Sequence, residues 1–362
     1  MKSKEGISLI FQGKVIIITG GTGSLGKMLV SRLLREKMPP AKLIVFSRDE
    51  AKQHEMRLQY LNSTAATDEV IYNNFKQLVE FRIGDVRNYA DVCSALKDVD
   101  IVINAAALKQ VPVCEYFPVQ AIMTNCLGAN NIVRAIGEND LPVRVVVGVS
   151  TDKAAKPVNA MGMSKALQER IFISANILNK KTRFVCVRYG NVLASRGSVI
   201  PLFHYQIKNG GPLTLTDPKM TRFLLSLDQA VDTVIAAIEH ALPGEIFVPD
   251  VPSVKIENVA KALIGDRPIE MKYIGVRPGE KMHEILISEE EIHHTIKRGA
   301  YYVIRPMLPE LRAEDEPFTG VLEKEFSSAD NLLDYEGTVE LLRSNKLMVE
   351  DIDLSADSEI LR

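Results

Sequence analysis

The feature that most constrains the fold is a glycine-rich turn between a short apolar run and a helical segment. The apolar run is Lys14–Thr19, and Gly20, Gly23 and Gly26 follow it at even spacing. Such glycines allow a tight turn and let the backbone approach an anion, while the helix that begins there offers free N–H groups. An ordinary glycine-rich turn is the alternative. The position between strand and helix favours a dinucleotide-binding unit.

Further apolar runs recur along the first half of the chain, and each is short, rich in Val and Ile, and apolar on both faces. They are Lys42–Phe46, Glu80–Ile83, Ile101–Ala106, Arg144–Val149 and Phe184–Arg188. Runs of this kind predict strands of a buried parallel sheet. Segments with helical spacing of apolar residues, such as Leu25–Glu36 and Pro118–Glu138, separate them. The alternation predicts an α/β protein with a Rossmann-type doubly wound parallel sheet.

The second half of the chain has a different pattern. After Asn191 come short strands (Leu213–Leu215 and Glu245–Val248), a helix from about Asp228 to His240, and many prolines, which suggest a smaller C-terminal lobe. We expect a cofactor-binding domain over 1–190, to which later segments contribute, and a substrate-binding lobe over 191–310. A tail over 311–362 is expected to cap that lobe or join an oligomer interface. The long connection from Gln59 to Gln77 is expected to be a surface excursion.

The composition is that of a globular protein, with 46% hydrophobic and 25% charged residues. A formal net charge of −2 gives no reason to expect binding to nucleic acid or to a membrane surface. The four cysteines lie far apart, which predicts reduced, mostly buried thiols rather than disulfides. The six histidines show no ligand spacing, and His293-His294 is expected on a solvated helix face, so no metal site is predicted. We expect a cytoplasmic homo-oligomer without a membrane-inserted segment.

The choice of cofactor depends on the residues after the second predicted strand. An NAD enzyme usually carries an acidic residue there for the adenosine ribose, whereas this chain has Ser47-Arg48-Asp49. A hydroxyl and a guanidinium suit a ribose 2′-phosphate, so we expect NADP. If Arg48 is instead a solvated cation paired with Asp49 or Glu50, then Asp49 can take the ribose and NAD would bind.

Other expected cofactor contacts lie at the ends of the first four strands. Asp85 follows the third strand, where an Asp can accept from the adenine amino group, although a turn or a helix cap explains it equally well. Small residues after the fourth strand let a cofactor lie close. The expected contacts are Gly20, Thr22, Gly23, Ser24, Leu25, Gly26, Ser47, Arg48, Asp85, Val86, Ala105 and Ala106.

Several motifs resemble the extended short-chain dehydrogenase/reductase superfamily and, within it, the UDP-N-acetylglucosamine 4,6-dehydratases that invert carbon 5. They are Ala106–Pro112, Ser150–Ala154, Pro157–Lys165, Gly190–Ser198, Thr216–Phe223 and Arg277–Lys281. The resemblance covers residues 13–305 and explains neither Gln59–Gln77 nor the tail. It implies NADP as cofactor, a small-molecule UDP-sugar as substrate, and a UDP-4-keto-6-deoxy-L-arabino-hexosamine as product for surface-polysaccharide synthesis.

The resemblance also assigns acid–base roles to Asp152 and Lys153, which follow the fifth predicted strand. Lys153 is expected to remove the proton on carbon 5, and Asp152 to protonate the leaving hydroxyl of carbon 6. These roles need a neutral lysine and a protonated carboxyl at least transiently. Burial favours both forms, and the mutual attraction of the pair opposes them. The spacing by itself would suggest an ordinary surface ion pair.

One departure from the superfamily concerns the Tyr-x-x-x-Lys pair of the next helix. Here Met161 occupies the tyrosine position and Lys165 follows four residues later. A thioether cannot act as a base, so Met161 is expected to be a neutral packing neighbour, while Lys165 is expected to hold the cofactor ribose. The group that takes the proton of the carbon 4 hydroxyl stays open among Lys165, Lys153 and Thr151 acting through a relay.

By the same resemblance, the substrate lies against residues of the second half. Asn191, Arg196 and Ser198 are expected to hold the diphosphate, Thr216, Thr221 and Arg222 to line the uridine, Arg277 and Glu280 to close over the nucleotide, and Lys109 to contact the substrate. Taken singly, each Arg is equally well explained as a surface cation. Two other functions stay open. One is a UDP-N-acetylhexosamine 4-epimerase, which shares the first hydride step, and the other is a non-catalytic NADP-binding scaffold or sensor.

Overall fold

A nine-stranded sheet forms the centre of the computed structural model, which describes residues 10–36, 39–61, 69–193, 198–312 and 320–351. Its parallel strands are β1 (Val15–Thr19), β2 (Lys42–Ser47), β3 (Val79–Ile83), β4 (Ile101–Asn104), β5 (Val145–Val149), β6 (Arg183–Val187) and β10 (Ile246–Pro249). The strands β15 (Tyr301–Ile304) and β14 (Thr295–Arg298) extend one edge in antiparallel fashion. The order is β14-β15-β10-β6-β5-β4-β1-β2-β3.

The predicted strands of the first half are confirmed to within one or two residues. The central strands are buried on both faces, as for Ile16, Ile17 and Ile18 of β1, whereas the edge strand β3 is only half-buried. The fourth strand is shorter than predicted, because it ends at Asn104 and not at Ala106. There the Thr19 hydroxyl donates to Asn104 Oδ1 at 2.7 Å, and Thr19 Oγ1 accepts from the backbone N–H of Ala106 at 3.3 Å. These side-chain contacts add to the backbone pairing of the two strand ends, where the Ala105 N–H donates to the Thr19 carbonyl at 3.2 Å.

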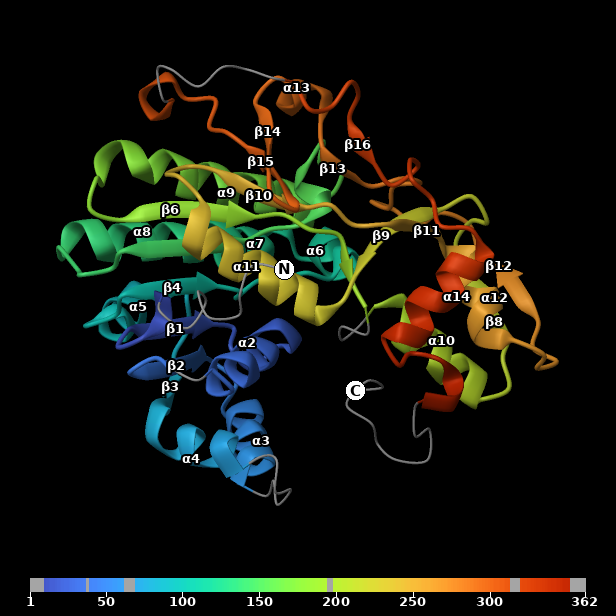
Figure 1. Ribbon diagram of the computed structural model, residues 1–362, viewed down its shortest axis with the longest axis horizontal. Helices are drawn as coiled ribbons and strands as arrows, with labels where there is room; N and C mark the ends of the chain where they lie inside the picture. The colour runs from blue at the N-terminus through green and yellow to red at the C-terminus, as the bar shows by residue number, and fades with distance from the viewer. Residues whose placement is uncertain (1–9, 37–38, 62–68, 194–197, 313–319, 352–362) are drawn as a thin grey trace.

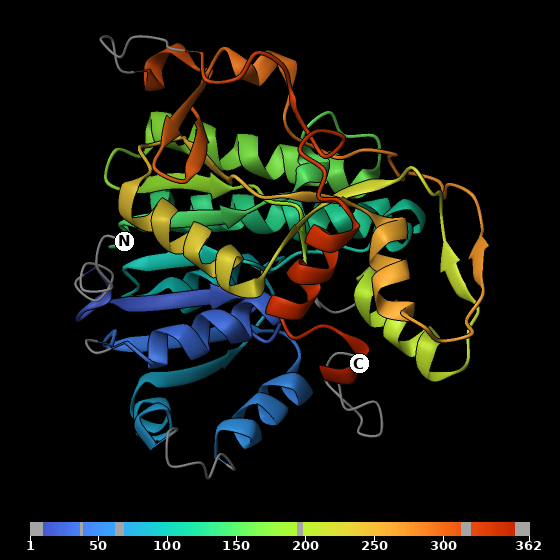
Figure 2. The ribbon, with the colours of Figure 1, turned by 45° about the vertical axis from the view of Figure 1, so that its right-hand side comes forward.

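Helices cover both faces of the sheet, which Figures 1 and 2 show from two directions. On one face α2 (Ser24–Leu34) packs against α11 (Leu227–His240). On the other face α5 (Tyr89–Leu96), α8 (Gly128–Glu138) and α9 (Ala160–Leu178) pack side by side. The predicted helix from Pro118 to Glu138 consists of α7 (Pro118–Ala121), a π-helical turn (Ile122–Leu127) and α8. The architecture is thus the predicted doubly wound α/β sheet.

The connection after β2 is not the surface excursion expected for Gln59–Gln77. It contains α3 (Glu50–Leu61) and α4 (Glu69–Leu78), while residues 62–68 lie outside the described part of the chain. The ring of Phe75 is buried and stacks on Tyr60, with ring centroids 4.6 Å apart. The described part of this connection is therefore not confined to the surface, because aromatic residues from the two helices pack in the main core.

The predicted second lobe also needs a correction. Both α11 and β10, which the sequence pattern placed in that lobe, belong to the large sheet, and their apolar residues lie in its core. The strand β10 is buried along its whole length between β6, with which it pairs in parallel, and β15, with which it pairs in antiparallel fashion. These are the later segments that contribute to the first domain.

A second hydrophobic cluster lies beside the large one. It is built from α10 (Val199–Lys208), β8 (Leu213–Leu215), β9 (Thr221–Leu225), β11 (Ser253–Lys255), α12 (Ile256–Ile264), β12 (Met271–Tyr273) and α14 (Tyr335–Ser344). Two small sheets join its strands, β11-β9-β7 and β12-β8, where β7 spans Asn191–Val192. The bounds of β8 are those that the sequence predicted.

The described part of the tail packs on both clusters. The strand β16 (Phe326–Ser327) pairs with β13 (Ile285–Ile287), and the Phe326 ring lies 5.0 Å from Phe223 and 5.2 Å from Tyr302. Further along, α14 packs on α12. The tail therefore joins the second cluster to the large sheet.

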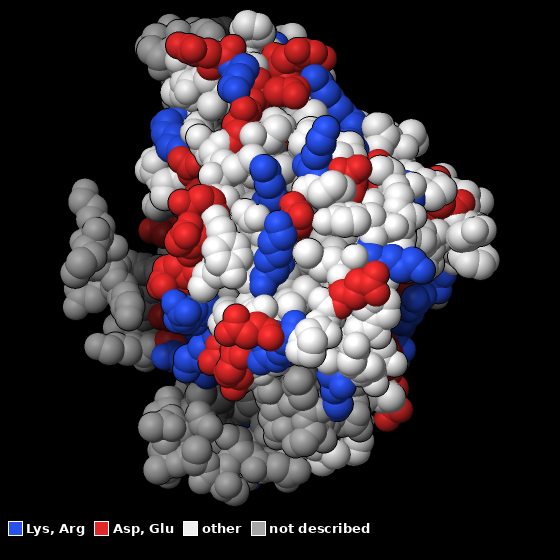
Figure 3. All heavy atoms as spheres, turned by 90° about the vertical axis from the view of Figure 1, so that its right-hand side faces the viewer, with Lys and Arg blue, Asp and Glu red and all other residues white. Residues whose placement is uncertain are grey.

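The surface that carries α12, α14 and β12 shows Lys and Arg side chains interspersed with Asp and Glu (Figure 3). Among the residues described, there is also no helix with the length and apolar character that crossing a membrane requires.

Candidate active site

The predicted phosphate-binding turn has the geometry that its glycines require. Gly20 has a φ of +65°, and a Cβ at this position would lie 2.8 Å from the Cα of Ala106. The N-cap residue of α2 is Gly23, which has no side chain to occupy the first N–H groups of the helix. The turn therefore leads into a helix N-terminus that its N-cap side chain does not cover, a place where an anion is favoured.

The residues after β2 lie close to the turn. Thr22 Oγ1 and Ser47 Oγ are 3.1 Å apart. The Arg48 guanidinium lies 3.6 Å from Asp85, and its side chain is 57% exposed. Its expected alternative partner, Asp49, instead forms an ion pair with Lys52 at 2.6 Å. Arg48 is thus an exposed cation at the end of β2 with one long ionic contact.

Asp85 is engaged by other protein groups. Its carboxylate accepts from the Arg87 side chain at 2.6 to 3.0 Å and from the Arg87 backbone N–H at 3.0 Å. Burial raises the pKa of Asp85, but these hydrogen bonds outweigh it and hold the pKa below its ordinary value. The carboxylate therefore forms the turn that the sequence left as an alternative to adenine binding. Val86, next in the chain, is buried.

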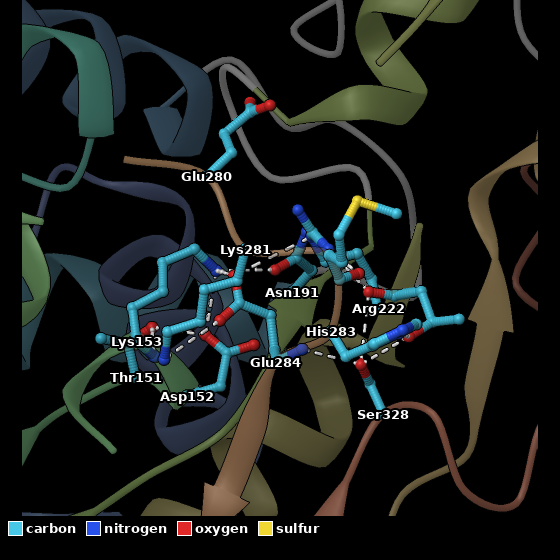
Figure 4. Close-up of polar contacts among 12 residues, drawn as sticks. Thr151, Asp152, Lys153, Asn191, Arg222, Glu280, Lys281, His283, Glu284 and Ser328 are labelled. Atoms are coloured by element: carbon cyan, nitrogen blue, oxygen red, sulfur yellow. Dashed lines mark hydrogen bonds and ion pairs between the residues drawn. The ribbon is translucent and has the colours of Figure 1, made fainter. Parts of the chain in front are cut away.

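The predicted acid–base pair follows β5 in a short 3-10 helix, Asp152–Ala154. Asp152 is fully buried, and its Oδ1 accepts from the Thr151 hydroxyl at 2.9 Å and from Lys153 Nζ at 3.0 Å. Lys153 Nζ also lies 3.1 Å from Glu284 Oε1 and donates to Asn191 Oδ1 at 3.4 Å (Figure 4). The pair is therefore part of a buried cluster and not a surface ion pair.

Glu284 is the member of this cluster that sequence reasoning missed. Its side chain is 2% exposed and comes from the segment just before β13. Arg222 Nε lies 3.9 Å from Glu284 Oε1, and Lys281 Nζ lies 3.9 Å from Oε2. Two features of the sequence could have indicated Glu284. It directly precedes the apolar run Ile285–Ile287, and it lies three residues after the Arg277–Lys281 motif.

The structure indicates which of the two opposing effects on Lys153 is the larger. Burial lowers the pKa of this lysine, but the negative charges of Asp152 and Glu284 outweigh burial and raise the pKa above its ordinary value. The positive charge of Arg222 opposes them only in part. Lys153 is therefore an ammonium ion in this arrangement.

Several buried polar atoms have no hydrogen-bond partner among the described residues. Within the cluster they are Asp152 Oδ2 and Glu284 Oε2, and Ser150 Oγ and Ser198 Oγ are two other buried oxygens without a partner. Buried carboxylate and hydroxyl oxygens are normally paired, and a ligand is one source of the missing partners. Two carboxylate oxygens beside an ammonium suit a ligand that carries several hydroxyl groups.

The helix α9 carries the residues expected at the Tyr-x-x-x-Lys positions. Met161 is 4% exposed and packs in a small apolar cluster with Cys114 and Ala121. Lys165 Nζ donates to the backbone carbonyl of Val149 at 2.6 Å and to Gln168 Oε1 at 2.8 Å. Burial lowers the pKa of Lys165 to about 8, so this lysine gives up its proton far more readily than Lys153 does.

A second group that sequence reasoning missed links α9 to the π-helical turn. Asn125 lies in that turn, is fully buried, and donates to Ser164 Oγ at 2.8 Å. Its side chain also exchanges hydrogen bonds with the backbone of Leu108 at 2.9 and 3.0 Å. The local widening of the helix is a frequent feature of functional sites, and here it fixes the loop after β4 against α9.

The predicted substrate residues are only partly brought together. Thr221 is buried, and its hydroxyl lies 2.8 Å from both His283 Nδ1 and Ser328 Oγ. Arg222 is buried beside Glu284, and Asn191 lies at Lys153. The other predicted substrate residues are not brought to this cluster by any contact described above. Lys109 and Arg277 are exposed, and Thr216 is half-buried. Ser198 directly precedes α10, and Arg196 lies outside the described residues.

Glu280 lies apart from the acid–base cluster and points away from it in Figure 4. Its Oε2 accepts from the backbone N–H of Arg277 at 3.4 Å. The neighbouring Gly279 carbonyl accepts from Asn159 at 2.7 Å, which anchors this segment to the start of α9.

Comparison with known proteins places the chain in a family. Residues 16–306 match the family described as polysaccharide biosynthesis protein. The chain belongs to this family. A protein of Rickettsia bellii (strain OSU 85-389) named UDP-glucose 4-epimerase is 44% identical over 355 residues, which cover 95% of this chain and 99% of the relative.

Solved structures show the same fold. The X-ray structure of Pen from Bacillus thuringiensis has a TM-score of 0.83 at 33% identity and covers 93% of this chain and 99% of its own. The structure of DesIV, the dTDP-glucose 4,6-dehydratase from Streptomyces venezuelae, has NAD bound and gives a TM-score of 0.62 at 18% identity, with coverages of 74% and 86%. At this identity the DesIV likeness shows the fold alone. The predicted Rossmann-type fold is confirmed.

Proposed function

We propose that this protein is an NADP-dependent UDP-N-acetylglucosamine 4,6-dehydratase that inverts carbon 5. The observation that carries the proposal is the buried cluster of Asp152, Lys153 and Glu284 at the carboxyl edge of the parallel sheet. α/β enzymes place their active sites at this edge. Removal of the carbon 5 proton and loss of the carbon 6 hydroxyl need acid–base groups that act on neighbouring carbons.

The residues of the cluster suit these two steps. In the proposed scheme Lys153 removes the carbon 5 proton after it has lost its own, and Asp152 donates to the leaving hydroxyl. The unpartnered Oδ2 of Asp152 supports the role, because this buried oxygen has no hydrogen-bond partner among the described residues and suits a substrate hydroxyl. Thr151 holds the other oxygen of the same carboxyl at 2.9 Å.

The turn after β1 fits a dinucleotide, and the residues after β2 support NADP. Gly20, Gly23 and the N-terminus of α2 would hold the pyrophosphate, and the exposed Arg48 would meet a 2′-phosphate, since Asp49 is occupied by Lys52. The nicotinamide supplies a hydride acceptor for carbon 4 and a hydride donor for carbon 6. Lys165, whose pKa of about 8 leaves part of it neutral near neutral pH, is the candidate that we favour for the carbon 4 hydroxyl proton.

A 4-epimerase is the second candidate, because the Rickettsia bellii relative carries that name at 44% identity. Epimerisation needs the first hydride step and a base at carbon 4, but it breaks no bond to carbon 6. A buried Asp-Lys-Glu cluster beyond the carbon 4 base has no task in that reaction. This difference favours dehydration.

The test is the product formed from UDP-N-acetylglucosamine. Dehydration lowers the mass by one water, whereas epimerisation leaves the mass unchanged. Proton NMR of the fresh product then reports carbon 5, where L-arabino couplings support inversion and D-xylo couplings contradict it. A run in deuterium oxide is expected to add deuterium at carbon 5, while the hydrogen at carbon 6 comes from carbon 4 without dilution. A product of unchanged mass would refute the dehydratase and support the epimerase.

We also propose that the protein is a homo-oligomer. Large apolar side chains are exposed on α6 (Val111–Tyr116), α7, the π-helical turn and α9, including Val113, Tyr116, Phe117, Val119, Ile122, Met163 and Leu167. A clustered apolar surface of this kind is typical of a contact between subunits. Light scattering after gel filtration is expected to give a multiple of the 40.2 kDa chain mass, and a monomer mass would contradict the proposal.

A further inference from the structure

The Lys153 ammonium is held by carboxylates from two separate segments of the chain. Asp152 is its neighbour in the sequence, and Glu284 comes from the segment that precedes β13. The distances from Nζ are nearly equal, 3.0 Å to Asp152 Oδ1 and 3.1 Å to Glu284 Oε1. The second carboxylate thus contacts the lysine as closely as the first.

The position of Glu284 is fixed on both sides by buried contacts. Its backbone N–H donates to Ser328 Oγ at 2.9 Å, and its carbonyl accepts from the Ser328 N–H at 2.8 Å. Two residues later, the carbonyl of Leu286 accepts from the buried Arg188 at 2.9 Å. Ser328 lies in the tail, beyond the segment 16–306 that matches the family. The tail therefore helps to hold this carboxylate in place.

The charges that face Lys153 come from every element packed around it. Asp152 and Glu284 are negative, while Arg222 of β9 and Lys281 of the preceding segment are positive. The negative charge of Glu325 also acts on Lys281. If Glu284 were neutral, Lys153 would keep a single carboxylate and would still feel the two cations. Its ammonium form would then be much less favoured.

We propose that Glu284 is a positioning residue for Lys153. The Glu284 carboxylate holds the lysine ammonium and so decides at which pH Lys153 is free to remove a proton from the sugar. The inference rests on the proposed function for its link to catalysis. It adds to that function a residue that acts on the reaction through Lys153. The raised pKa of Lys153 agrees with this role, since Glu284 is one of the two charges that raise it.

The first test is the pH dependence of kcat/KM, which reports the essential base of the free enzyme. In the wild type, kcat/KM is expected to rise with pH through the whole range in which the protein stays folded. Glu284→Gln keeps the shape of the side chain and removes its charge, so kcat/KM of this variant is expected to reach a plateau at a pH at which that of the wild type is still rising. Glu284→Asp restores the charge and is expected to move the profile back toward the wild type. Glu289→Gln, at an exposed glutamate paired with Lys156, is the matched control and is expected to leave the profile unchanged.

A second measurement needs no turnover. The rate at which acetic anhydride labels Lys153, followed by mass spectrometry across pH without substrate, gives the pH at which this lysine loses its proton. The proposal expects this pH to be lower in Glu284→Gln than in the wild type. Coinciding labelling curves would overturn the inference, as would a folded Glu284→Gln enzyme whose kcat/KM profile is unshifted.

The labelling also separates the two proposals. If the wild type releases no water from the UDP-sugar, the proposed function fails, while the comparison of labelling curves still decides the role of Glu284. If Glu284→Gln does not fold, the wild-type curve and the Glu284→Asp curve are sufficient. A wild-type Lys153 that loses its proton at or below the range of an ordinary lysine, about pH 10.4, would refute the role of Glu284.

Discussion

Replacement of Arg188 by methionine should destabilise the protein more than any surface charge substitution. Arg188 is fully buried at the end of β6, and its guanidinium donates to both carboxylate oxygens of Glu169 and of Glu291 at 2.7 to 3.0 Å. It also donates to the carbonyl of Leu286 at 2.9 Å. Arg188→Met keeps most of the side-chain volume but leaves two buried carboxylates without their counter-ion. Removal of one partner from a buried ion pair costs about 3–5 kcal/mol of stability. Because Arg188→Met leaves two buried carboxylates without a counter-ion, we expect a loss at the upper end of this range.

The assay is urea unfolding followed by far-ultraviolet circular dichroism, because the chain contains no tryptophan. Arg343→Met is the control. Arg343 is exposed and forms a long ion pair with Glu340 at 3.8 Å, so its replacement should change the free energy of unfolding by less than about 1 kcal/mol. The triple variant that adds Glu169→Gln and Glu291→Gln removes the stranded charges and is expected to recover most of the loss.

The pH dependence gives a second check on the same reasoning. Burial raises the pKa of Glu291, but the charge and hydrogen bonds of Arg188 outweigh it and lower the pKa below its ordinary value. A lowered carboxylate pKa stabilises the fold above the unfolded-state pKa, and this stabilisation is lost as pH falls through the folded-state value. The difference between wild type and Arg188→Met should therefore shrink in acid. A loss no larger than that of Arg343→Met near neutral pH would refute the argument.

Three further predictions concern the site. Arg48→Ala should weaken NADP binding by about 1.5–3 kcal/mol and barely change NAD binding, as measured by calorimetric titration; equal NADP affinity in variant and wild type would contradict the cofactor assignment. Lys153→Ala should abolish water loss and leave binding of the nucleotide sugar nearly intact, and substantial residual turnover would exclude Lys153 as the base. Met161→Ala should lower the free energy of unfolding by about 2–5 kcal/mol, because the side chain is buried against Cys114 and Ala121. Its turnover per folded molecule should fall far less than that of Lys153→Ala, and an equal fall would give Met161 a direct part in catalysis.

Much of the fold could be predicted because the signals are local. Strands with Val and Ile on both faces, such as β1 and β5, are recognisable from five residues each, and they form a parallel sheet because only a sheet covered on both sides buries both faces. The glycine positions after β1 could be predicted for a similar reason, since the φ of +65° at Gly20 suits a residue without a side chain. The predicted free cysteines are also confirmed, with Cys114, Cys126 and Cys186 buried.

Other features could not be predicted because they depend on packing between distant segments. The residues of α11 and β10 do not indicate that these elements pack with the large sheet and not with the second cluster. Apolar periodicity shows that a face is buried, but it does not show which element that face packs against. The helices α3 and α4 were missed because a long connection favours loop, although Tyr60 and Phe75 meet across it.

The sequence by itself determined the sheet, the phosphate-binding turn and the positions of Asp152 and Lys153 after β5, since each depends on residues that are close together in the chain. Only the tertiary structure decided the charge state of that site. Glu284 reaches Lys153 from the far half of the chain, and Ser328 fixes Glu284 from beyond the family segment. Electrostatic energy depends on distance and on exclusion of water, and neither quantity can be obtained from residue spacing. For this reason the sequence could identify a lysine as a base, whereas the folded chain shows that this lysine rests as an ammonium ion between two carboxylates.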